Sequence, residues 1–133
     1  MTAFSNFLEN ELLDHVLRGS AYTSPAPIFV ALYTDDPTDA DSGTEVAASG
    51  YARLEIGTTA GRAFTTASGG SSKNNEAWEM TASTAWGTIT HFGLRDATAA
   101  GNLLYYGALT TAKVIGTDDI LRFSTGSLSV KHD

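Results

Sequence analysis

From residue 28 onwards the chain alternates short segments rich in β-forming residues with clusters of Gly, Ser, Asn and Asp. Two such clusters are Ser68–Ser72 and Gly116–Asp119. The strand-like segments are Ile28–Tyr33, Tyr51–Ile56, Ala63–Thr66, Asn75–Met80, Thr88–Leu94, Leu103–Leu109, Ile120–Ser124 and Leu128–Val130. Short strands with frequent turns and no helices between them are typical of antiparallel sandwiches and barrels. We therefore predict a mainly β fold, a single antiparallel, jelly-roll-like β-sandwich with its strands within residues 28–130.

The alternation along these segments also predicts which side chains are buried. In Thr88–Leu94 neither face is clearly polar, which indicates a strand that is covered on both sides or closed on one side by a partner. The expected core consists of Ile28, Val30, Leu32, Trp78, Phe92, Leu94, Leu104, Tyr106 and Phe123.

The segment before the first strand has a different period. Between Ser5 and Arg18, five aliphatic residues recur at helical spacing, while charged and amide side chains take the other face. The five are Leu8, Leu12, Leu13, Val16 and Leu17. Ser5 or Thr2 suits the N-cap, and Gly19 suits the left-handed residue that ends a helix. We predict one N-terminal α-helix over residues 5–18, joined to the sheet through a stiff segment containing Pro25 and Pro27.

Length and charge limit the classes of function. A chain of 133 residues fits one domain, which we place at residues 1–133. The net charge is −7, and the eight basic residues are scattered, so a nucleic acid or an anionic membrane is not an expected partner. The sequence contains no cysteine, no signal-peptide pattern and no apolar run near the roughly 20 residues of a membrane helix. We expect a soluble protein.

The densest polar cluster spans residues 35–45 and leaves two interpretations open. It contains Asp35, Asp36, Asp39 and Asp41, so it is either a solvated acidic hairpin or a cation site. The spacing of an EF-hand is not met, because Gly43 comes one position early. We favour the hairpin and expect the four carboxylates to be exposed, with no ion held by three of them.

No pattern indicates catalysis, and we expect no enzyme, no cofactor, no catalytic residue and no metal ligand. His15, His91 and His132 lie far apart without a metal-binding spacing, and neither a Gly-x-Ser-x-Gly elbow nor a phosphate-binding loop is present. Trp78 and Trp86 are either platforms for a sugar or core residues. The inward strand position of Trp78, and the place of Trp86 before a Gly at the start of a strand, favour the core.

Several segments, taken in order, resemble a family of small tailed-bacteriophage and prophage proteins. They are Phe4–Val16 followed by Gly19–Thr23, Phe29–Thr34, Gly43–Arg53, Trp86–Leu94 and Gly101–Leu109. Members of this family are usually labelled tail-fibre or virion structural proteins. The resemblance implies a virion component that is made in the host cytoplasm, and it implies no catalytic residue.

The sequence and the resemblance together predict a structural component of a tailed-phage virion that packs against other virion proteins. A tail-associated fibre, tip or baseplate accessory is the leading hypothesis. A capsid decoration (cement) protein and a carbohydrate-binding receptor-recognition domain that holds a host glycan are the alternatives. We expect a homo-oligomer, for which the resemblance suggests a trimer, and a protein interface that includes Leu8, Leu12 and Val16.

Overall fold

The computed structural model describes residues 2–57 and 63–132, which form one helix and nine strands. In chain order these elements are β1 (Thr2–Phe4), α1 (Asn6–Arg18), β2 (Ile28–Tyr33), β3 (Leu54–Ile56), β4 (Ser71–Lys73), β5 (Trp78–Thr81), β6 (Gly87–Arg95), β7 (Leu103–Ile115), β8 (Ile120–Phe123) and β9 (Ser129–Lys131).

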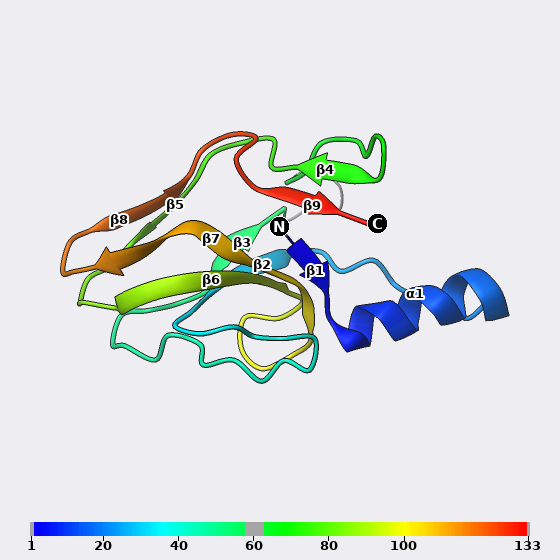
Figure 1. Ribbon diagram of the computed structural model, residues 1–133, viewed down its shortest axis with the longest axis horizontal. Coiled ribbons are helices and arrows are strands. Elements are labelled where there is room, and N and C mark those ends of the chain that lie inside the picture. Colours follow the sequence, from blue (N-terminus) through cyan, green and yellow to red (C-terminus); the bar gives the residue numbers. More distant parts are fainter. Residues whose placement is uncertain (1, 58–62, 133) are drawn as a thin grey trace.

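The strands form two layers. One layer is a five-stranded sheet in the order β1-β7-β6-β2-β3, and the other consists of the pairs β4-β9 and β5-β8 (Figure 1). Every pairing between the described strands is antiparallel. The protein is thus a mainly β, antiparallel sandwich with an N-terminal helix, as the sequence predicts.

The core lies between the two layers. Val30, Leu32 and Leu94 face it from the five-stranded sheet, and Trp78 and Phe123 face it from the β5-β8 pair. Rings meet across the layers, as between Phe92 and Phe123, whose centroids lie 6.0 Å apart. Seven of the nine predicted core residues are buried, while Ile28 and Tyr106 are half-buried.

The other face of the five-stranded sheet is covered by the chain itself. Phe29, Ala31 and Tyr33 point away from the main core and are nevertheless buried. The loops that follow β2 and β6 run along this side (Figure 1). From Phe92 to Arg95 the strand β6 is therefore covered on both sides, whereas Thr88 near its start is exposed.

The local signals of the helix are confirmed. Ser5 is the N-cap, and its side chain accepts a hydrogen bond from the Leu8 backbone N–H. Gly19 ends the helix with a left-handed φ of 70°, a conformation that side chains with a Cβ rarely adopt.

The strand predictions differ from the structure in several places. The strand predicted at Leu103–Leu109 extends to Ile115 in β7, and the one predicted at Asn75–Met80 begins only at Trp78 in β5. Ala63–Thr66 forms only an isolated bridge between Phe64 and Asn74, and the predicted strand at 51–56 shortens to β3. The predicted loop Ser68–Ser72 contains the start of β4, and Thr2–Phe4 forms β1. In these places pairing with distant segments, rather than local propensity, decides the conformation.

Candidate interaction surface

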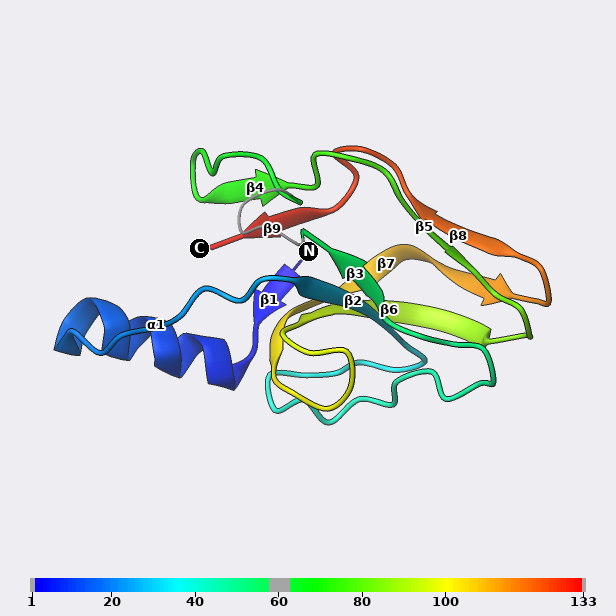
Figure 2. The same cartoon turned by 180° about the vertical axis from the view of Figure 1, so that it is seen from behind.

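Helix α1 extends away from the sandwich, and only its first turns lie against the body, next to β1 and β7 (Figures 1 and 2). The segment after Gly19 runs back along the helix to β2. We call residues 6–27 the arm. Figures 1 and 2 show it from opposite sides, and in both views its far end stands clear of the two layers.

The apolar side chains of the helix become more exposed from the root of the arm to its far end. Leu8, at the root, is buried by its own chain, and Leu12 is half-buried. Further out, Leu13 is 56% exposed, and Val16 and Leu17 are each 75% exposed. These last three residues share one helix face, because they are spaced at i, i+3 and i+4. We call them the arm tip.

The root of the arm is fixed by Ser5, which is almost fully buried. The Ser5 hydroxyl accepts the hydrogen bond from Leu8 N–H at 3.2 Å and donates to the Leu103 carbonyl of β7. The Ser5 backbone N–H donates to the Leu104 carbonyl at 3.0 Å. The residue that starts the helix therefore also sets where the helix leaves the sheet.

The acidic loop, which we define as residues 35–45, supports this root from a second side. The Asn6 backbone N–H donates to the Asp39 carbonyl at 2.8 Å, and the Tyr106 hydroxyl donates to the Asp39 carboxylate. Burial and this carboxylate raise the pKa of Tyr106 to about 12, so the phenol keeps its proton at neutral pH.

Two arginines hold the acidic loop and the loop after β6 against the sheet. The Arg95 guanidinium makes two hydrogen bonds of 2.7 Å to the Asp41 carboxylate, and it also donates to the Tyr33 hydroxyl and the Gly101 carbonyl. Burial opposes the charge of Arg95, but these partners outweigh it and raise the pKa of the guanidinium. Only 7% of the Arg95 side chain is exposed.

Arg53 makes the same kinds of contact as Arg95, to a carboxylate of the acidic loop and to carbonyls of the loop after β6. It donates to both carboxylate oxygens of Glu45, at 2.8 and 2.7 Å, and to the carbonyls of Ala97 and Ala100. Burial would raise the pKa of Glu45, but hydrogen bonds from Arg53 and Tyr51 lower it below its ordinary value. Neither arginine was predicted as a site residue. Arg95 lies one residue beyond the predicted strand Thr88–Leu94, and the carboxylate and carbonyl partners of both arginines lie in loops.

The acidic loop connects the arm to the five-stranded sheet through these hydrogen bonds. Asp35, Asp36, Asp39 and Asp41 are exposed, as predicted. Gly43 lets the loop close tightly, because a Cβ there would lie 2.6 Å from the Cα of Pro37. Within residues 2–57 and 63–132, no three His, Asp or Glu side chains gather as a metal site would require.

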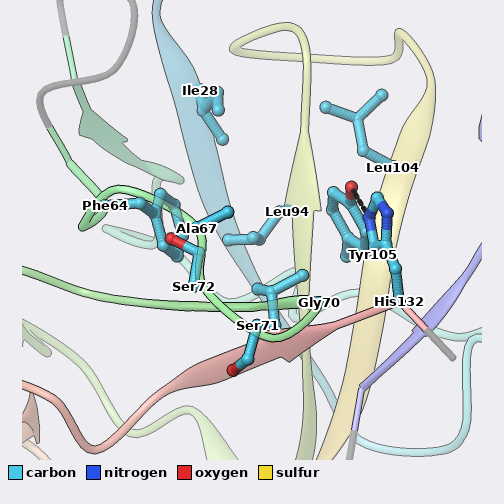
Figure 3. Close-up of a pocket in the computed structure, with 11 residues that line it drawn as sticks. Ile28, Phe64, Ala67, Gly70, Ser71, Ser72, Leu94, Leu104, Tyr105 and His132 are labelled. Carbon is cyan, nitrogen blue, oxygen red and sulfur yellow. Dashed lines mark hydrogen bonds between the residues drawn. The ribbon is translucent and has the colours of Figure 1, made fainter.

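An apolar pocket of about 310 Å³ opens at one end of the sandwich, between the five-stranded sheet and the β4-β9 pair (Figure 3). We call it the end pocket. Its walls are Ile28, Phe64, Ala67, Gly70, Ser71, Ser72, Leu94, Leu104, Tyr105, Val130 and His132. The one polar contact drawn in it joins the Tyr105 hydroxyl and His132 Nε2 at 2.5 Å. Burial raises the pKa of Tyr105 to about 12 and lowers that of His132.

The remaining candidate residues are not brought together. His15 contacts the Ser20 carbonyl, His91 contacts the Thr90 hydroxyl, and His132 borders the end pocket. Trp78 and Trp86 are both buried. Trp78 packs against Phe64 and Phe123, and Trp86 packs against Tyr51, so neither indole offers an exposed platform to a sugar.

Residues 3–131 match the family described as Podophage GP4 fiber I protein gp80. The chain belongs to this family. The gp80-type match covers the arm, the acidic loop and the end pocket, so all three are parts of a phage fibre-type protein. No curated protein matches the sequence. Among the described residues of this gp80-type chain, no helix has the length and apolar character to cross a membrane.

Proposed function

We propose that this chain is a structural, tail-associated component of a bacteriophage virion that acts by packing its arm against another subunit. The proposal treats residues 1–133 as one domain without catalytic activity. Membership of a fibre family supports the tail location. The observation that carries the packing role is the arm tip, three aliphatic side chains that the chain itself leaves in water.

The energetics favour a partner for the tip. Burying a Val or Leu side chain fully stabilises a protein by about 1.5–3 kcal/mol. Helices of this length are marginal in water without packing, and α1 packs on its own chain mainly through its first turns. An arm with a fixed root and an uncovered tip is suited to reach a neighbour. We retain Leu12 and Val16 in the proposed interface and add Leu13 and Leu17, while Leu8 holds the root.

The test introduces a charge at the tip. Val16→Glu places a carboxylate on the proposed contact, and Val114→Glu is its matched control, because Val114 is 74% exposed in β7. We expect both variants to fold with circular dichroism and melting temperatures close to those of the unaltered chain. Val16→Glu should fail to enter particles in a complementation assay, whereas Val114→Glu should enter normally.

Two results would contradict the proposal. Normal incorporation of Val16→Glu would show that the tip is not an interface. Electron microscopy of gold-labelled or tagged particles gives the location, and density on the capsid shell instead of the tail would favour the cement-protein alternative.

A further inference from the structure

We propose that the end pocket of one copy of this chain receives the arm tip of a second copy, so that the subunits join head to tail. This inference rests on the proposed function, and it names the partner of the tip and the place where the tip binds. Leu13, Val16 and Leu17 would insert between the two layers of the neighbouring sandwich.

The end pocket is an unfinished part of the hydrophobic core. Ile28, Phe64 and Tyr105 pack against the buried core cluster yet remain only partly buried. Figure 3 shows side chains from the sheet on one side and Ala67, Ser71 and Ser72 on the other, all around the same space. Water gains little hydrogen bonding in such a space, because polar partners for it are few. An apolar plug would complete the core.

The chain cannot easily plug this pocket with its own tip. Ser5, Leu8 and Asp39 fix the first turn of α1 against β7 and the acidic loop. The whole helix has 13 residues and is about 20 Å long at 1.5 Å per residue, and beyond its first turns it extends away from the sandwich. The tip is therefore held away from the body that carries the pocket, and the pocket that it reaches belongs to another copy.

The size of the end pocket suits this pairing. A cavity of about 150 Å³ holds one benzene molecule, so a pocket of about 310 Å³ has room for two or three aliphatic side chains.

A contact between two different patches of the same chain is heterologous. Repetition of such a contact gives a closed ring when the rotation closes, and an open filament when it does not. Every copy then uses its tip once and its pocket once. A ring of few subunits would bury every tip, so this contact predicts a small, discrete oligomer.

The first experiment uses the absence of cysteine from the chain. In the variant Val16→Cys/Ala67→Cys, oxidation should produce disulfide-linked multimers that disappear on reduction. Ala67 is chosen because it lines the pocket from an exposed loop. The matched control Val114→Cys/Ala67→Cys should yield far fewer linked chains. Two results would overturn the proposal: equal yields of disulfide-linked multimers in both variants, or a disulfide that forms only within single chains.

The second experiment separates the two halves of the contact. Val16→Glu disables the tip, and Ala67→Trp fills the pocket, with melting curves confirming that both fold. By analytical ultracentrifugation, the unaltered chain and Val114→Glu should form the same discrete oligomer, while each of the two variants should be monomeric. An equimolar mixture of Val16→Glu and Ala67→Trp should form a dimer, because one intact tip meets one intact pocket.

The outcomes distinguish this inference from the proposed function. An Ala67→Trp chain that assembles normally, or an unaltered chain that stays monomeric at its highest attainable concentration, overturns the head-to-tail contact. If Val16→Glu is still excluded from particles in that case, the tip binds a different virion protein and the proposed function stands. Normal incorporation of Val16→Glu overturns both.

Discussion

The ion pair between Asp41 and Arg95 gives the sharpest test of how this fold is held together. The substitution Asp41→Asn keeps the shape of the side chain and removes its charge. The Arg95 side chain, which is only 7% exposed, would keep the Tyr33 hydroxyl and the Gly101 carbonyl as partners but would lose its counter-charge. Burial of an unpaired charge is what makes such a change costly.

The magnitude follows from the exposure of the two partners. Removing one member of a buried pair costs about 3–5 kcal/mol. The Asp41 side chain is 33% exposed, so solvent screens part of the interaction, and we expect a loss of about 2–4 kcal/mol in the free energy of unfolding. An unfolding entropy of about 2.1 cal/mol/K per residue converts this loss to a melting temperature lower by about 7–15 °C.

Urea denaturation followed by circular dichroism measures the loss, with an unchanged slope confirming that only stability has changed. Glu79→Gln is the matched control, because its partner Arg122 is 54% exposed and Glu79 is 49% exposed. An exposed pair contributes about 0–1 kcal/mol. A loss for Asp41→Asn no larger than that for Glu79→Gln would refute the argument, as would a double variant Asp41→Asn/Arg95→Met less stable than Asp41→Asn alone.

Two further predictions concern the core and the response to acid. Leu32→Ala removes a fully buried side chain from the central part of the five-stranded sheet and should cost about 2–5 kcal/mol by urea denaturation; a cost below about 1 kcal/mol would show that β2 is not central. The pKa of Glu45 is lower in the folded chain than its ordinary value of 4.5, so its stabilising contribution is present above pH 4.5 and is lost as the pH falls through the folded value. Stability measured from pH 7 down to pH 3 should therefore fall less steeply in Glu45→Gln than in the unaltered chain, and parallel curves would contradict this assignment.

The parts of the fold that sequence patterns predicted correctly are those with local causes. The helix has an apolar period, a Ser at its start and a Gly at its end within about 15 residues of one another, so one short segment contains all of its signals. The strands β2, β6 and β8 are likewise recognisable from their own residues. Burial of Trp78 also followed from its strand position, and burial of Trp86 from its place just before a strand.

The missed strands depend on distant partners. β1 pairs Thr2 with Gly107, and β4 pairs Ser71 with Lys131. Each segment is only three residues long and β4 contains no β-former, and the partner strands lie far along the chain, so pairing and burial decide the conformation rather than a local pattern. The end pocket could not be predicted from local patterns either, because the residues that line it are spread along the chain from Ile28 to His132.

The direction of the arm is a tertiary property with an identifiable physical basis. Periodicity showed that the helix has an apolar stripe, but the same stripe would suit a helix lying flat on the sandwich. The Ser5 hydroxyl on β7 and the Asp39 carbonyl on Asn6 decide between these arrangements, because together they fix two successive residues at the helix start.

Hydrogen bonds join the acidic loop to both the arm and the five-stranded sheet. Asp39 contacts the first turn of α1 through Asn6, and two residues later Asp41 joins Arg95 on the five-stranded sheet. Glu45, at the end of the same loop, accepts hydrogen bonds from Arg53, which also donates to the Ala97 carbonyl in the loop after β6. Acidic residues that resemble a solvated hairpin in sequence thus connect the root of the arm to the five-stranded sheet. An arm that presents three aliphatic side chains to a neighbour needs such a connection, because ordering a loose arm on binding would cost conformational entropy.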